Sequence, residues 1–111
     1  MKKPNYFLPK NRYLELKYYA TQYKYWEKVR DNEQSLPADR ANANIAIYKV
    51  SNAILAVNCD FNSDILFDCV TNSLTFKRLT EKYGAEMPDK EVFYDAYRKF
   101  FYFLSKMKGI G

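Results

Sequence analysis

The sequence contains no histidine, which removes imidazole both as a metal ligand and as a general base. It also has no glycine-rich phosphate loop and no G-x-S-x-G motif, so the residues on which nucleotide-binding enzymes and many hydrolases depend are missing. We therefore expect a protein that is not an enzyme and that uses no cofactor.

Glycine and proline are scarce, with three and four residues in a chain of 111. An all-β domain needs a turn about every ten residues and draws on these two residue types to make it. No apolar run approaches the roughly 18 residues of a membrane-spanning helix, and no apolar segment follows Lys2 and Lys3 as it would in a signal peptide. These absences favour an all-α protein of the cytoplasm without a membrane partner.

Only two cysteines are present, Cys59 and Cys69, and their spacing is not that of a C-x-x-C motif. No histidine is available to complete a zinc site, so we expect two free, buried thiols. Three carboxylates, those of Asp60, Asp64 and Asp68, recur at intervals of four residues, and such oxygens suit Mg²⁺. Because Asp60 falls outside the helix expected to follow it, we interpret the three as a solvated acidic face and expect no metal site.

The chain is instead rich in apolar and aromatic residues, at 48% and 18% of its composition. A sequence this apolar is not disordered. Its 111 residues are enough for one core and leave little room for a second domain. We therefore expect a single helical domain over residues 1–111, a compact bundle of four to five helices.

The charges are distributed unevenly along the chain, whose net charge is +5. Residues 1–30 carry eight basic and two acidic side chains, residues 31–70 carry two and six, and residues 71–111 carry eight and five. Two basic ends around an acidic middle suit an anionic partner such as nucleic acid. An ordinary solvated surface is the alternative explanation.

The N-terminal half predicts an arm and two long helices. Residues 1–10 contain two prolines and form an extended arm in this prediction, and Asn11 is a suitable N-cap for a helix over residues 12–30. That helix has two adjacent apolar rows: Leu14, Tyr18, Thr21, Tyr25 and Val29 in one, and Leu16, Tyr19, Tyr23 and Trp26 in the other. The next helix, over residues 39–59, carries a seam of Ala43, Ile47, Val50, Ile54 and Val57. We expect the seam to pack in the core, although it also permits a homodimer.

Three further helices are expected in the C-terminal half. Ser63 can cap a short helix that ends near residue 70, a second short helix covers residues 74–83, and a long helix follows Asp89 and ends near residue 108. Gly84 stands where the end of a helix favours a positive φ. Each of these helices has one side that is expected to be buried. These sides consist of Ile65, Leu66, Cys69 and Val70 in the first helix, of Phe76, Leu79 and Tyr83 in the second, and of Phe93, Ala96, Tyr97, Phe100, Leu104 and Met107 in the long one.

Residues 73–108 thus place a short helix, a turn and a long helix in the order of a helix-turn-helix unit. In such a unit the second helix enters the major groove of DNA and the first crosses the backbone. The side chains that would contact phosphates or bases are Lys77, Arg78 and Lys82 on the first helix and Lys90, Tyr94, Arg98 and Lys99 on the second. The acidic residues Asp89, Glu91 and Asp95 on the second helix oppose this hypothesis, because carboxylates repel phosphate.

Both ends of the chain resemble small phage and mobile-element proteins of Gram-positive bacteria. The string FYDAYRKFFYFL, which starts at Phe93, and the segment TFKRL, which starts at Thr75, are similar to the C-terminus of that group. The opening YFLPKNRYLELKYYATQY, with Trp26 behind it, is similar to its start. The C-terminal part resembles phage late-gene activators of the ArpU/RinA kind, which are similar to the DNA-binding region 4 of sigma factors.

This resemblance implies a transcriptional regulator that binds double-stranded DNA in the cytoplasm of a bacterial host. It also implies DNA contacts from Tyr94, Asp95, Arg98 and Lys99. The family usually places a basic residue where this chain has Ala96, so a contact at that position is not expected.

A phage origin brings a second class of function, the protein-binding inhibitor of host defence, of which anti-CRISPR proteins are one example. The chain has eleven tyrosines, and an exposed Tyr19, Tyr23 and Trp26 would suit a host protein such as RNA polymerase or a CRISPR effector. If they are buried, these side chains complete an aromatic-rich core instead. Exposed aromatics among lysines also suit single-stranded nucleic acid, but no spacing in the chain selects that use.

Overall fold

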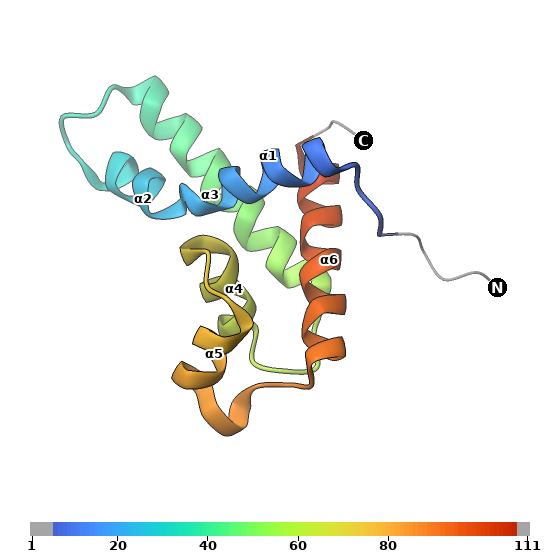
Figure 1. Ribbon diagram of the computed structural model, residues 1–111. Helices are drawn as coiled ribbons and strands as arrows, with labels where there is room; N and C mark the ends of the chain where they lie inside the picture. Colours follow the sequence, from blue (N-terminus) through green and yellow to red (C-terminus); the bar gives the residue numbers. More distant parts are fainter. Residues whose placement is uncertain (1–5, 109–111) are drawn as a thin grey trace.

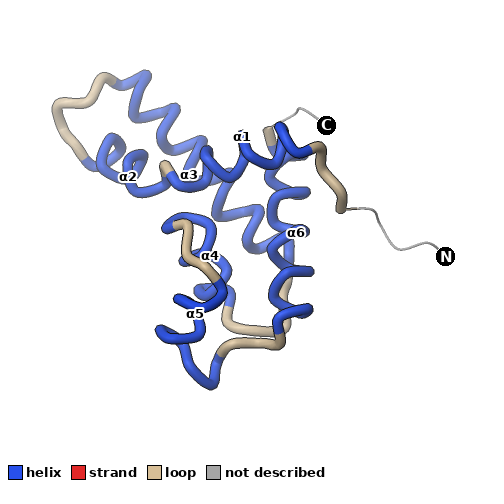
Figure 2. Tube along the Cα trace, viewed as in Figure 1, coloured by secondary structure: helices blue, strands red, loops and turns tan. Residues whose placement is uncertain are grey.

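The structure, a computed structural model, describes residues 6–108 and consists of helices joined by short loops (Figures 1 and 2). Within this range no strand occurs, so the predicted all-α bundle is confirmed. The elements in chain order are α1 (Lys10–Thr21), α2 (Tyr23–Asp31), α3 (Pro37–Val57), α4 (Ser63–Asn72), α5 (Phe76–Tyr83), the 3₁₀ turn η1 (Gly84–Glu86) and α6 (Lys90–Met107).

Helix α3 runs through the middle of the molecule and contacts α2, α4 and α6 (Figure 1). Helix α1 packs against α4 and crosses the C-terminal half of α6, while α5 lies at the far end beside α4. Side chains from four helices meet without any solvent exposure in the centre of this arrangement: Leu16, Val50, Leu66, Phe100 and Leu104. Burial of such side chains is the main stabilising contribution to the fold.

The single helix predicted over residues 12–30 is wrong, because the chain turns at Gln22 and forms α1 and α2. The turn lets α1 pack on α4 and α6 while α2 packs along α3, which one straight helix cannot do. Of the two predicted rows, the one that contains Leu16 and Tyr23 faces the core, whereas Tyr18 and Tyr25 are exposed. Helix α1 begins after Pro9, so Asn11 lies inside its first turn and is not the N-cap.

The seam predicted on the central helix is confirmed as core, since Ala43, Ile47, Val50, Ile54 and Val57 are all buried. In α4 the capping residue is Asn62 rather than Ser63, because the Asn62 side chain accepts a hydrogen bond from the Asp64 N–H (3.0 Å). Helix α4 continues to Asn72, two residues beyond the predicted end.

The predicted helix–turn–helix order of the C-terminal third is present. Thr75 caps α5 by accepting a hydrogen bond from the Arg78 N–H, and Gly84 ends it with a φ of 55°. Six residues, 84–89, then lead through η1 into α6. The two helices meet where Phe76 lies edge-to-face on Phe93, with ring centroids 5.7 Å apart. The α6 residues Phe93, Ala96, Phe100 and Leu104 are buried as predicted, and Tyr97 and Met107 are half-buried.

The arm lies beside α6 as far as it is described. Residues 6–9 are not helical, and Tyr6 packs edge-to-face against Tyr102, with ring centroids 5.1 Å apart. Residues 1–5 of the predicted arm lie outside the described residues, and Lys10 already belongs to α1. The arm therefore occupies part of the outer side of the helix that the sequence analysis proposed as the DNA-reading element.

Candidate nucleic-acid interface

Helix α5 is an amphipathic helix that presents basic side chains to solvent. Leu79 is its one fully buried residue, and Lys77, Arg78 and Lys82 are exposed. The helix is short, with eight residues, so packing has to hold it in place because isolated helices of this length are unstable in water.

A buried carboxylate on α4 helps to hold α5. Asp68 accepts hydrogen bonds from Lys82 Nζ, from Tyr83 Oη (2.9 Å) and from Asn72 Nδ2. Burial by itself would raise the pKa of Asp68, but the hydrogen bonds from Lys82, Tyr83 and Asn72 outweigh burial and lower the pKa below its ordinary value. Lys82 is therefore an anchor of α5 as well as a surface cation.

Two lysines from the N-terminal helices lie near the basic side of α5. Lys24 of α2 lines a hollow of about 470 Å³ together with Arg78 and Lys82. Lys17 of α1 lines a neighbouring aromatic cleft that Thr75 and Phe76 border. Neither lysine is among the site residues predicted from the sequence, although one signal was present: Lys17 and Lys24 are seven residues apart, which places them on one side of the single helix predicted over residues 12–30.

The first turn of α6 adjoins the start of α5. The Lys90 ammonium lies 5.9 Å from the centroid of the Phe76 ring, and Tyr94 stacks on the same ring with centroids 6.1 Å apart. Tyr94 is half-buried by this contact. Lys90 thus extends the basic side of α5 across the junction between the two helices.

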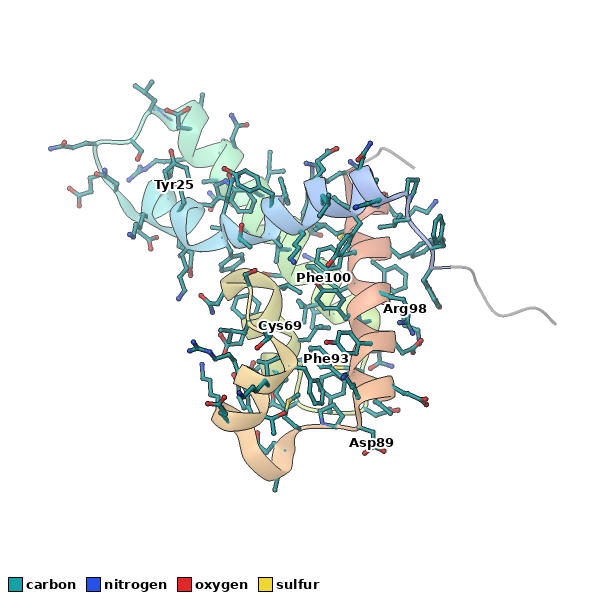
Figure 3. The ribbon with its side chains drawn as sticks, in the orientation of Figure 1. Tyr25, Cys69, Asp89, Phe93, Arg98 and Phe100 are labelled. Carbon is teal, nitrogen blue, oxygen red and sulfur yellow. The ribbon has the colours of Figure 1, made fainter. Side chains whose placement is uncertain are left out.

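Arg98 and Lys99 lie on the outer side of α6, away from the basic side of α5 (Figure 3). Figure 3 shows Phe93 and Phe100 pointing from α6 toward α4, whereas Arg98 points to the opposite side. Lys99 forms an ion pair with Asp95 (3.0 Å), and its ammonium lies 5.5 Å from the centroid of the Tyr6 ring in the arm. The positions proposed from the sequence therefore lie on two adjoining parts of the surface, which Lys90 and Tyr94 connect because both also line a hollow with Arg98.

The two parts differ in charge. The outer side of α6, with the loop residue next to it, carries three basic and four acidic side chains: Lys90, Arg98, Lys99, Asp60, Asp89, Glu91 and Asp95. The other part, which we call the basic surface, consists of Lys17, Lys24, Lys77, Arg78, Lys82 and Lys90. Two carboxylates, Asp68 and Glu81, line the hollow within the basic surface beside Lys24, Arg78 and Lys82, so the residues that line this hollow carry a net charge of +1. The basic side chains therefore outnumber the acidic ones in the basic surface but not on the outer side of α6.

The aromatic residues proposed for a protein partner are largely inside the molecule. Tyr23 is buried, where it packs edge-to-face on Phe67 (centroids 4.9 Å apart). Tyr19 and Trp26 are half-buried against each other, with centroids 4.6 Å apart, and Lys108 covers the Tyr19 ring at 3.8 Å. Tyr23 is therefore not exposed in the way that this form of the inhibitor hypothesis requires, whereas Tyr19 and Trp26 keep part of their surface open to solvent.

The thiols and carboxylates form no further site in the described part of the chain. Cys59 and Cys69 are both free thiols, but only Cys69 is buried as predicted, because Cys59 is half-exposed; burial raises the pKa of Cys69 to about 11. Its S–H donates to the carbonyl oxygen of Leu74 (3.2 Å). Among residues 6–108, no three Cys, Asp or Glu side chains gather in the way that a metal ion requires.

Comparison of the chain with protein-family models, with curated proteins and with solved structures gave no match in any of the three. The resemblance to phage regulators thus depends on the quoted residues alone. In the range that the structure describes, no helix combines the length and the apolar character needed to cross a bilayer.

Proposed function

We propose that the protein binds duplex DNA through the basic surface and acts as a transcriptional regulator of phage origin, as the sequence resemblance implies. The observation that carries the DNA-binding proposal is the convergence of basic side chains from α1, α2, α5 and the start of α6 on one side of the molecule. Lysine and arginine contacts to phosphates supply a large part of the affinity of DNA-binding proteins.

The charges change the roles that the sequence analysis gave to the two helices. Helix α5 makes the main phosphate contacts in this proposal, with Lys77 and Arg78 at its exposed first turn. Helix α6 contributes Lys90 beside them, while the carboxylates of Glu91 and Asp95 keep its outer side away from the phosphates. Phosphate contacts carry no base information, so we expect strong salt dependence and weak sequence dependence.

The test removes two charges from the basic surface and measures binding to a 20–30 base-pair duplex by fluorescence anisotropy. We expect the double variant Lys77→Gln/Arg78→Gln to bind about tenfold more weakly at 0.1 M salt. The slope of a plot of log K, where K is the association constant for the duplex, against log[salt] should become shallower by about 1.8, because each phosphate contact contributes about 0.9. Both side chains are exposed, and the hydrogen bond that caps α5 uses the backbone N–H of Arg78, which the substitution leaves in place, so the fold should be retained.

The matched control is Lys28→Gln/Lys106→Gln, which removes the same charge from exposed positions on α2 and α6, outside the basic surface. It should change the affinity less than twofold. Equal weakening by the two double variants would show that net charge alone attracts DNA, and it would contradict the proposal. A wild-type protein that shows no duplex binding at 0.1 M salt would contradict it as well.

A further inference from the structure

Helix α3 has a second apolar seam, and this one faces solvent. The seam consists of Ala41, Ile45, Tyr48, Asn52 and Leu55, which follow one another at steps of four, three, four and three residues. Ile45, Tyr48 and Leu55 are 51%, 67% and 71% exposed, and the buried core seam occupies the other side of the same helix. A helix that is apolar on both sides is normally buried on both sides.

The surroundings of this outer seam are almost free of charge. From Ala41 to Asn58 the only charged residue is Lys49, in a chain of which 28% is charged. The positions beside the seam are otherwise occupied by small or neutral side chains such as Asn44, Ser51 and Ala56. Depletion of charge around exposed apolar and aromatic side chains is the composition of the centre of a protein interface.

We propose that the outer seam of α3 is a homodimer interface, occupied by α3 of a second copy of this chain. A strongly acidic or basic partner would find only one charge near this surface, that of Lys49, to pair with or avoid. Two copies that each carry +5 repel one another wherever their basic side chains meet, and the outer seam lets them approach without that repulsion.

The position of Asn52 supports a second copy of the same helix as the occupant. In the four–three pattern Asn52 stands at a position otherwise taken by apolar residues, and one asparagine at such a position fixes the register of paired helices at a cost in affinity. Its side-chain nitrogen donates to the Tyr48 carbonyl oxygen at 2.8 Å, which leaves its own amide oxygen to accept a hydrogen bond from the other copy.

The size of the outer seam sets the expected affinity. Weighted by their exposed fractions, Ile45, Tyr48 and Leu55 offer roughly 250 Å² on each copy. That is about a third of the ~800 Å² per partner in a stable complex, and the small neutral side chains along α3 have to supply the rest. We therefore expect a dissociation constant on the order of micromolar and not nanomolar.

The test measures mass by sedimentation equilibrium, without DNA, from about 5 to 500 µM, a range chosen to bracket micromolar dissociation. The wild-type mass should rise from 13.2 kDa toward twice that value. The variants Ile45→Lys and Leu55→Lys should remain at 13.2 kDa with unchanged circular dichroism, because both side chains are exposed in the single chain. Asn52→Leu should tighten association at least tenfold, because it removes the buried polar group.

The matched control is Leu14→Lys, the same change at an exposed leucine on α1. It should dimerise like the wild type. A wild-type protein that remains monomeric at 500 µM would overturn the proposal, and so would a Leu14→Lys variant that loses association as fully as Leu55→Lys. Because the measurement is made without DNA, its outcome is independent of the proposed DNA binding.

Discussion

The carboxylate of Asp68 has three hydrogen-bond donors around it, two of which come from α5. Replacement by asparagine removes the negative charge and leaves these donors with poorer acceptors. We expect Asp68→Asn to lower the free energy of unfolding by about 1.5–3 kcal/mol at pH 7, the range for a hydrogen bond to a charged group. Urea unfolding followed by circular dichroism measures this loss, and Glu33→Gln in the exposed loop after α2 is the control.

The same site has a defined pH dependence. Because the folded-state pKa of Asp68 lies below its ordinary value of 3.8, the carboxylate adds stability above about pH 4, and this contribution disappears as the pH falls through the lowered pKa. The difference in unfolding free energy between wild type and Asp68→Asn should therefore be constant from pH 7 to pH 5 and shrink below pH 4. A difference that grows toward acid pH would show that the carboxylate is not stabilised in the folded protein.

At the scale of single elements, the end of α5 depends on Gly84, whose φ is 55° and whose ψ is −122°. A Cβ at this position would meet no atom within 4 Å, so the obstacle to a larger residue is backbone strain and not a clash. We expect Gly84→Ala to lower the unfolding free energy by about 1–3 kcal/mol, the usual cost of a residue held in a rare backbone conformation. Thermal unfolding measures this loss of stability, and an unchanged midpoint temperature in Gly84→Ala would contradict the prediction. Ala85→Gly is the matched control.

The elements also show what the sequence could and could not predict. The core seam of α3 and the buried stripe of α6 were predictable because one side of each helix is apolar at helical spacing. The turn at Gln22 was not, because the tyrosine-rich sequence around it remains compatible with a continuous helix and the turn depends on where α3, α4 and α6 lie. The ion pair of Lys82 with Asp68 and the contact of Lys99 with the Tyr6 ring were equally hidden, since both partners are distant in sequence.

The whole molecule divides into a well-connected centre and a less connected edge. Helix α3 contacts α2, α4 and α6, whereas α5 packs chiefly against α4 and η1. Amide hydrogens of α5 should therefore exchange with solvent through local opening, about tenfold faster or more than those in the buried half of α3. Hydrogen exchange measured by NMR tests this prediction. The substitution Asp68→Asn is expected to increase the exchange rates of the α5 amides further. Equal protection in α5 and α3 would show that the two unfold together.

If both proposals hold, one dimer presents two basic surfaces to DNA. Because the two copies are joined through α3, the distance between their two DNA contacts is fixed, as in dimeric regulators that bind paired half-sites. The affinity for a long duplex would exceed that for a short one, because the second contact becomes intramolecular.

The contact between the first helix and the last has a consequence for the newly made protein. Arg12 donates to Ser105 Oγ at 3.3 Å, and the hydroxyls of Tyr13 and Tyr97 are 2.7 Å apart, across separations of 93 and 84 residues. At translation speeds of about 5–20 residues per second, α1 is synthesised roughly 5–20 s before its partner helix. During that interval α1 lacks its contacts with α6, while α2 and α3 can already pair, so we expect folding to begin with that pair and to be completed once α6 joins it.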